Sequence, residues 1–198
     1  PSYAEGEIGN TKLKQSLNKS RLTIQGYSIN RALINGLYKN LNYQLIWHGD
    51  KDEIFNDNGR KAIELLSKSE ENGLNPKDYS LDKLNKLIEK SNGNKIHHTD
   101  ILITQMFVNL VSDIANGGEI KKEWEIEHYL KRTPKIVNYL EVLNKFLSSG
   151  DVNRFIDEHS PKHSQYKNIK KFLAKLLIER DTLETKRHKN IKSGRSIY

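Results

Sequence analysis

The sequence predicts an all-α fold, a single compact bundle of about six to eight helices with flexible termini. Proline and glycine are scarce, at 4 and 12 of 198 residues, so few positions interrupt a helix. The bulk of the chain is leucine, isoleucine, lysine, asparagine and glutamate, a mixture that favours helices with charged outer faces. Apolar residues also recur at helical spacing along successive segments. A hydrophobic fraction of 35% is enough for one core.

The sequence predicts three parts of the chain, of which only the middle one is a folded bundle. We expect the bundle over residues 28–180, preceded by an N-terminal extension over 1–27 and followed by a basic linker over 181–198. The final stretch, ETKRHKNIKSGRSIY, loses its apolar periodicity, which is typical of a linker or a frayed end. We expect the linker to lead into further modules beyond Tyr198.

The first two helices are expected to begin at good N-cap residues. Ser28 precedes the first, and either Asn56 or Asp57 precedes the second. The apolar stripes of the two helices are Ile29, Ala32, Leu33, Leu37 and Leu41 in the first, and Ala62, Ile63, Leu65 and Leu66 in the second. Between them, the aromatic stretch YQLIW packs the chain against the core, and a polar loop follows it.

The connection ENGLNPKDYS carries several helix signals in a few residues. Gly73 can adopt the left-handed conformation that ends a helix, and Leu74 then suits the apolar contact of a Schellman motif. Pro76 prevents the helix from resuming. Tyr79 packs the loop on the core, and Ser80 caps the next helix, whose inward side is Leu81, Leu84, Leu87 and Ile88.

The most apolar segment, HTDILITQMFVNLVSDIANGGEI, predicts the central helix of the bundle. Its apolar residues cover well over half of a helix surface, as expected of a helix contacted on several sides. They are Ile101, Leu102, Ile103, Met106, Phe107, Leu110, Val111 and Ile114. We expect Thr99 or Asp100 to cap the helix, and Gly117 with Gly118 to end it.

Beyond the glycine pair, KKEWEIEHYLKR is ambiguous between loop and helix, with Trp124 as its anchor. Thr133 then predicts an N-cap, with Pro134 at the first helical position. The inward residues of that helix are Ile136, Val137, Leu140, Leu143 and Leu147. A short helix is expected from Asp151. A long final helix is marked by Tyr166, Ile169, Phe172, Leu173, Leu176 and Leu177.

Charge and cysteine content limit the function classes. The formal charge of +8 suggests an anionic partner, but the lysines are spread among 25 acidic residues, so a solvated surface explains them equally well and nucleic-acid binding is disfavoured. The absence of cysteine excludes disulfides, thiolate metal sites and a cysteine nucleophile within these residues. No run approaches the roughly 18 apolar residues of a membrane span. No secretion signal is visible at the first residues.

No metal site or cofactor is predicted, because each candidate cluster lacks a full ligand set. The clusters are His97, His98 and Asp100; His159 and His163, with Pro161 between them; and Asp50, Asp52 and Asp57 with Gly59. Phosphate-binding glycine loops and a Gly-x-Ser-x-Gly nucleophile motif are also absent.

Two further patterns have both a functional and a structural interpretation. Glu123, Glu125 and Glu127 could supply paired carboxylates to a small muramidase, but alternation with apolar residues is more simply the wet side of an amphipathic segment. The rings at element boundaries could stack on sugars, but the favoured interpretation is that they hold loops on the core. These rings are Trp47, Tyr79, Trp124 and Tyr166.

Four segments, taken in order, resemble a known domain. LYKNLNYQLIW is followed by NGLNPKDYSLDKL, then by HTDILITQMFVNLVSDIANGGEI with a later tryptophan, and finally by SPKHSQYKNIKKFL. The order and spacing are similar to those of the scaffold domain of the large bacterial L,D-transpeptidases, over roughly Ile29 to Ile178. The matching positions are Tyr43 to Trp47, Gly73, Leu74, Pro76, Tyr79, Asp100, Thr104, Gly117, Trp124, Pro161 and Tyr166.

The resemblance implies a periplasmic role in 3-3 cross-linking of peptidoglycan. Members of that family add a peptidoglycan-binding module and a YkuD-type catalytic domain with a His-Gly-Cys motif. This chain has no cysteine, so the catalytic motif does not carry over. The resemblance therefore implies a scaffold without chemistry of its own, which positions or flanks the catalytic domain. The alternatives are a stand-alone basic helical module that binds peptidoglycan or another anionic partner, and the small muramidase.

Overall fold

The computed structural model describes residues 2–49, 54–91, 95–118, 134–149 and 151–192. These residues form eight α-helices, two short 3-10 helices and one hairpin, so the predicted all-α bundle is confirmed. In chain order the elements are α1 (Ser2–Leu17), β1 (Thr23–Ile24), β2 (Tyr27–Ser28), α2 (Arg31–Asn40), α3 (Asp57–Ser67), η1 (Ser69–Asn72), η2 (Pro76–Tyr79), α4 (Leu81–Ser91), α5 (Ile96–Asn116), α7 (Tyr139–Ser149), α8 (Val152–His159) and α9 (Ser164–Lys192).

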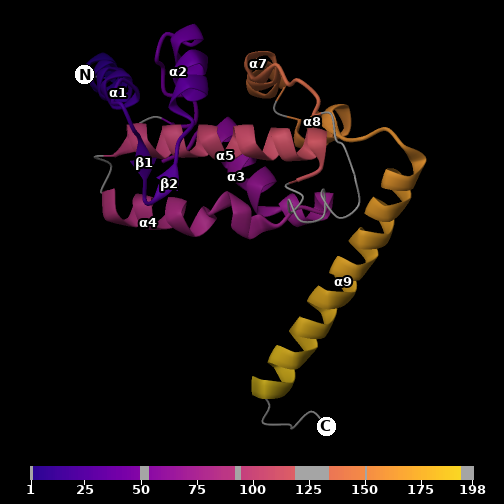
Figure 1. Cartoon of the computed structure of the whole chain (residues 1–198). Coiled ribbons are helices and arrows are strands. Elements are labelled where there is room, and N and C mark those ends of the chain that lie inside the picture. The colour runs from indigo at the N-terminus through magenta and orange to yellow at the C-terminus, as the bar shows by residue number, and fades with distance from the viewer. Residues whose placement is uncertain (1, 50–53, 92–94, 119–133, 150, 193–198) are drawn as a thin grey trace.

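Helix α5 is the centre of the bundle, as its apolar sequence predicts. It is contacted by α1, α2, α3, α4 and α8, so most of its surface faces other elements (Figure 1). Every residue from Thr99 to Val108 is buried. Gly117 ends the helix in the left-handed conformation, with φ of 73°, and its N–H donates to the Asp113 carbonyl. The start differs from the prediction: α5 begins at Ile96, so Thr99 and Asp100 lie inside the helix instead of capping it.

The hairpin before α2 corrects the predicted start of the first helix. β1 and β2 pair antiparallel, with Thr23 opposite Ser28 and Ile24 opposite Tyr27. Positive φ angles at Gln25 and Gly26, 50° and 72°, make the two-residue turn that joins twisted strands well. Ser28 is therefore a strand residue. The cap of α2 is Asn30, whose Oδ1 accepts from the Leu33 N–H at 3.3 Å.

The N-terminal helix was not expected from the sequence. Its apolar residues are sparse, so the sequence predicts an extension over residues 1–27. In the structure α1 packs on α5 and α2, with Leu13 and Leu17 fully buried. The second half of α1 therefore contributes to the core. Tertiary contact, more than an amphipathic pattern, holds this helix.

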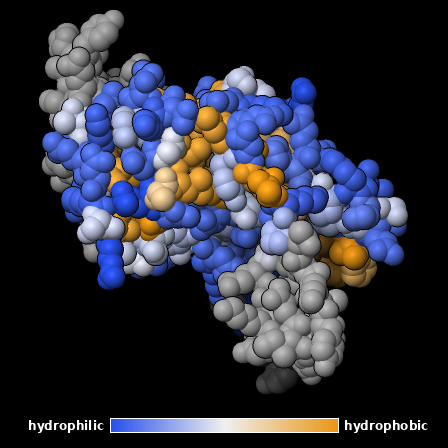
Figure 2. Space-filling model, turned by 45° about the horizontal axis from the view of Figure 1, so that its top comes forward, coloured by the Kyte–Doolittle hydropathy of each residue, from blue (hydrophilic) through white to orange (hydrophobic). Residues whose placement is uncertain are grey.

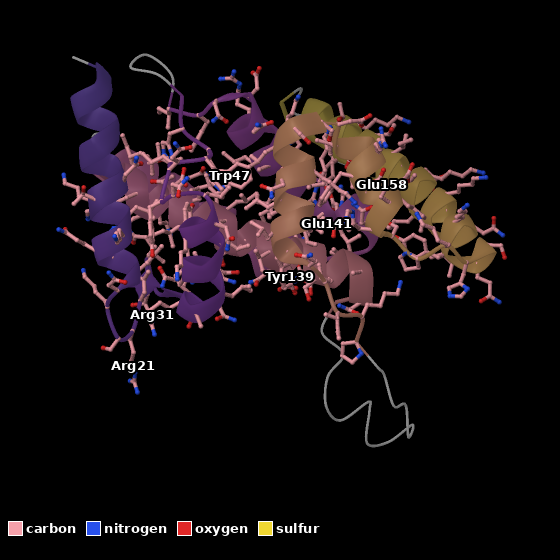
Figure 3. All side chains as sticks on the ribbon, turned by 90° about the horizontal axis from the view of Figure 1, so that it is seen from above. Arg21, Arg31, Trp47, Tyr139, Glu141 and Glu158 are labelled. Carbon is pink, nitrogen blue, oxygen red and sulfur yellow. The ribbon has the colours of Figure 1, made fainter. Side chains whose placement is uncertain are left out.

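An aromatic cluster of Trp47, Phe107, Phe146 and Phe155 lies in the core between α5, α7 and α8. Trp47 is fully buried near the middle of the molecule (Figure 3), with its ring centroid 5.7 Å from that of Phe107 and 6.1 Å from that of Phe146. Phe146 of α7 and Phe155 of α8 stack with Phe107 of α5 at 4.9 and 5.5 Å. Tilted and edge-on ring pairs of this kind stabilise a core beyond their buried area. These ring contacts help to join α7 and α8 to the bundle.

The predicted helix at Pro134 starts later than expected. Residues 134–138 are not helical, and α7 begins at Tyr139 after Asn138, whose Oδ1 accepts from the Glu141 N–H. Ile136, expected to point inward, is fully exposed at 102%. Thr133 lies outside the described residues, as does Trp124. The Asp151 cap of α8 is confirmed, since Asp151 Oδ1 accepts from the Arg154 N–H at 3.0 Å.

The last helix leaves the bundle. Figure 1 shows α9 running from its start beside α8 to a C-terminal end well away from the central helices. It extends to Lys192, through much of the stretch expected to be a linker. The face drawn in Figure 2 is mostly hydrophilic, with separate apolar areas. Among the described helices, none combines the length and the apolar character needed to cross a bilayer.

Candidate functional site

The polar side chains buried on α5 form the most organised site in the described part of the chain. Asp100, one turn into α5, is fully buried. Its Oδ2 accepts from the Trp47 N–H at 2.9 Å, and the Ile46 N–H lies 3.2 Å from both carboxylate oxygens. Tyr38 of α2 donates its hydroxyl to Oδ1 at 2.5 Å, and His48 Nδ1 lies 2.8 Å from Oδ2. One carboxylate therefore fixes α2 and the Trp47 segment to α5.

Thr104 completes this group one turn later. Its Oγ1 donates to the Asp100 carbonyl at 2.9 Å and accepts from Trp47 Nε1 at 2.8 Å, while the Tyr38 hydroxyl lies 2.7 Å away. We call Tyr38, Trp47, His48, Asp100 and Thr104 the Asp100 cluster. Because residues four apart share a helix face, Asp100 and Thr104 present two acceptors to the same loop.

A second polar stripe lies on another face of α5. Gln105 Oε1 accepts from the Asn30 N–H at 2.7 Å, and Gln105 Nε2 donates to Asn109 Oδ1 at 2.8 Å. Asn109 in turn donates to the Tyr27 hydroxyl at 2.9 Å. Asp113, one turn further, accepts from the Tyr79 hydroxyl at 2.8 Å. This stripe attaches the hairpin, the start of α2 and the η2 turn to α5.

The chain around Trp47 is also held from α3. Asn56 donates its amide to the carbonyls of Ile46 and His48, at 2.9 and 3.1 Å, and its Oδ1 caps α3 through the Gly59 N–H at 2.8 Å. Gly59 packs directly under this loop: a Cβ there would lie 2.2 Å from the Trp47 carbonyl oxygen. Only glycine permits that approach.

The segment from Glu71 to Ser80, the Gly73 connection, has the backbone geometry predicted at Gly73. Gly73 has φ of 76°, the Leu74 N–H donates to the Ser69 carbonyl, and the Gly73 N–H donates to the Glu70 carbonyl. These two bonds are those of a Schellman motif. Pro76 is the first residue of the separate 3-10 helix η2, so the helix that ends before Gly73 does not resume there. Ser80 lies before α4 in the left-handed conformation, with φ of 47°.

The Asp100 cluster is suited to holding structure and not to acid–base turnover. Burial, followed by the neighbouring Asp100 charge, raises the pKa of Tyr38 well above its usual value. Burial also raises the pKa of Tyr79, and its hydrogen bond to Asp113 adds to the increase. Both phenols therefore stay protonated and donate. The Asp100 carboxylate accepts hydrogen bonds from backbone N–H groups and a hydroxyl of its own chain, so its acceptor capacity is used internally.

The structure brings some of the sequence-predicted residues together and separates others. Trp47, Asp100 and Thr104 share the Asp100 cluster. Gly73, Leu74, Pro76 and Tyr79 lie in one connection beside the end of α5, where Leu74 is in reach of a Cβ built on Gly118. Pro161 lies between α8 and α9, and the half-buried Tyr166 lies at the start of α9, so neither belongs to these two groups. Trp124 lies outside the described residues.

Sequence reasoning missed the partners of these residues. Tyr38, Gln105, Asn109 and Asp113 all make buried or half-buried links. The available signal was the presence of polar residues four apart inside the most apolar helix. Such residues need internal partners, because an unsatisfied buried polar group is costly.

The candidate metal clusters do not converge where the structure describes them, and Asp50 and Asp52 of the third cluster lie outside the described residues. In the described ranges, no three histidine, cysteine, aspartate or glutamate side chains are arranged to hold an ion. Asp100 is instead part of the buried network. His97 and His98 are half-buried, with ring centroids 4.3 Å apart. Burial, the His98 charge and lysines 12 and 19 lower the pKa of His97 to about 4.

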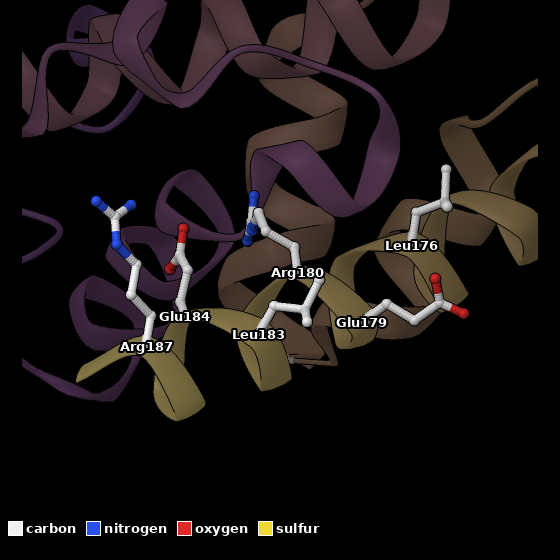
Figure 4. Close-up of a pocket in the computed structure, with 6 residues that line it drawn as sticks. All are labelled: Leu176, Glu179, Arg180, Leu183, Glu184 and Arg187. Carbon is white, nitrogen blue, oxygen red and sulfur yellow. The ribbon is translucent and has the colours of Figure 1, made fainter. Parts of the chain in front are cut away.

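A hollow of about 410 Å³ lies along α9 (Figure 4). The described residues that line it are Leu176, Glu179, Arg180, Leu183, Glu184 and Arg187. In the close-up, Arg180, Glu184 and Arg187 extend from the same side of the helix. Arg180 also forms a two-point ion pair with Glu70 of η1, at 2.8 and 3.0 Å, which ties α9 to the bundle.

Comparison with known proteins places the chain in a family. The family model described as "Scaffold domain" matches residues 32–173, well over half of the chain. The chain belongs to the Scaffold domain family. The matched range begins in α2 and ends in α9, so it includes the whole Asp100 cluster and the Gly73 connection. Neither the curated proteins nor the solved structures gave a match.

Proposed function

We propose that this chain is the non-catalytic scaffold domain of a peptidoglycan L,D-transpeptidase in the periplasm. In this role it positions or flanks a YkuD-type catalytic domain, alongside a peptidoglycan-binding module of the same polypeptide. The scaffold-family match supports the architectural part of the proposal. The order of the four sequence segments that resemble those enzymes supports the transpeptidase part.

The observation that carries the proposal is that the buried polar residues bind other parts of the same chain. Asp100, Thr104 and Tyr38 bind the chain's own backbone and side chains, and Asp100 is fully buried. A network of this kind rigidifies a helical framework. A rigid frame is what a domain needs in order to hold a neighbouring catalytic module in one orientation.

In-frame removal of codons 32–173 from the natural gene tests the proposal. We expect 3-3 cross-links, measured by mass spectrometry of muropeptides, to fall strongly while immunoblotting still detects the shortened protein in the periplasm. Unchanged 3-3 cross-linking would overturn the scaffold role. A cytoplasmic protein would overturn the periplasmic location.

The purified 198-residue polypeptide tests the alternatives. We expect it neither to cross-link muropeptides nor to release soluble fragments from sacculi. Fragment release that is lost in Glu125→Gln or Glu127→Gln would instead establish the muramidase. Co-sedimentation with sacculi that weakens with salt would favour the stand-alone binding module.

A further inference from the structure

The first half of α9 exposes an apolar stripe to solvent. Ile169, Phe172 and Leu176 are 67%, 62% and 45% exposed. Their spacing of three and four residues places them on one side of a helix with about 3.6 residues per turn. Large apolar side chains grouped on one exposed helix face indicate a surface that meets another apolar phase.

Lysines surround this stripe. Between Ser164 and Ile178 the charged residues are Lys167, Lys170, Lys171 and Lys175, with no acidic residue among them. Helical geometry places Lys170 and Lys175 on opposite borders of the stripe. Their side chains can extend beside an apolar surface while the ammonium groups reach anionic groups above it.

The second half of α9 has a different character. Leu183 continues the exposed stripe at 64%, but Glu179, Asp181 and Glu184 lie around it. The helix therefore changes from a wholly basic segment to one of mixed charge after Ile178. A negatively charged surface is therefore complementary in charge to the first half of α9 alone.

The attachment of α9 leaves the stripe accessible. Arg180 binds Glu70 of η1, and η1 is the element that α9 contacts most. Leu173 and Leu177, which helical geometry places on the same side as Arg180 or beside it, are more buried than Ile169 and Phe172. One side of α9 thus faces the bundle, and the stripe is presented beside it.

We propose that the first half of α9 docks on the surface of an anionic phospholipid bilayer. The exposed stripe enters the boundary between headgroups and acyl chains, and the lysines bind the phosphates and the excess negative charge. A basic helix with phenylalanine and leucine on the other face is the arrangement that lies in a membrane interface. This inference is independent of the proposed function.

Vesicle co-sedimentation of the full 198-residue chain tests the proposal. We expect binding to vesicles of phosphatidylglycerol and phosphatidylethanolamine, weak binding to phosphatidylcholine vesicles, and a loss of binding as salt rises. The double variant Lys170→Gln, Lys175→Gln should weaken binding roughly 25-fold, since each lysine near such a surface contributes about fivefold.

The helix supplies its own matched controls. Phe172→Ser should reduce vesicle binding strongly, whereas Leu183→Ser, at nearly the same exposure, should leave it unchanged. Likewise, Lys186→Gln with Arg187→Gln removes the same charge as the lysine pair but from the mixed half. If the variants in the two halves weaken binding equally, the proposal is wrong, because non-specific charge attraction then explains it.

The lack of cysteine permits a direct measurement of insertion. Asn168→Cys, one turn before Phe172 on the border of the stripe, and Leu183→Cys can each carry a single polarity-sensitive dye. With anionic vesicles we expect a blue shift at position 168 and little change at position 183. No shift at 168, or a wild-type chain that fails to bind the vesicles, overturns the proposal. Dimerisation lost in Phe172→Ser without vesicle binding would identify a second copy of the chain as the occupant instead.

Discussion

At the residue scale, Asp100 and Thr104 act as acceptors for several segments of the chain at once. They bind Tyr38 of α2 and the backbone and indole of Trp47, which are far from α5 in sequence. They contribute to the stability of the fold by accepting hydrogen bonds from donors that would otherwise be buried without partners. Loss of one acceptor therefore affects more than one element.

Thr104→Val should lower the free energy of unfolding by about 1–3 kcal/mol, because valine is nearly equal to threonine in size but leaves the buried Trp47 Nε1–H without its acceptor. Urea denaturation checks this. Thr182→Val is the matched control, since Thr182 makes the same intrahelical bond to Ile178 on the exposed part of α9. Equal effects in the two variants would argue against a role for the buried acceptor.

His97 should make stability depend on pH. Its pKa is lowered to about 4 in the folded chain, first by burial and then by the charge of His98, against about 6.5 in the unfolded chain. The unfolded chain thus binds more protons between these values. The stabilisation is present above about pH 6.5 and is lost as the pH falls toward 4.

Thermal denaturation from pH 7 to pH 4 checks the contribution of His97. We expect the melting temperature to fall less steeply in His97→Gln than in the wild type. His188→Gln, on an exposed part of α9, should follow the wild-type curve. Parallel curves for wild type and His97→Gln would refute the assignment.

At the element scale, two helical glycines predict opposite results. Gly59 of α3 lies against the Trp47 carbonyl, where a Cβ would approach to 2.2 Å, whereas Gly36 of α2 has open space around it. Gly59→Ala should destabilise the fold by about 1–3 kcal/mol through overpacking. Gly36→Ala should stabilise it by about 0.5–1 kcal/mol, because alanine loses less backbone entropy.

Chemical denaturation of both variants measures this difference. The two substitutions are chemically identical and both lie in α-helices, so helix propensity alone predicts the same sign for each. Stabilisation by Gly59→Ala would mean that the loop at Trp47 does not pack on α3 as described.

At the scale of the whole molecule, the bundle has one central helix with segments fastened around it. The apolar surface of α5 supplies the core, and its two polar stripes determine where each surrounding segment sits. The combination of an apolar core helix with polar attachment points explains how the helices form a rigid frame. It also explains why α9, attached chiefly through η1, presents a surface of its own.

Sequence by itself determined the helical class, the central helix, the Gly73 turn and the Asp151 cap, because these depend on spacing, composition and local backbone chemistry. Only the tertiary structure decided that Asp100 lies inside α5, that Leu13 and Leu17 of α1 join the core, and that Ile136 faces solvent. The physical reason is that burial and hydrogen-bond partners depend on residues distant in the chain. A carboxylate that suits a helix cap can serve equally well as a buried acceptor, and the segments that reach it decide which role it takes.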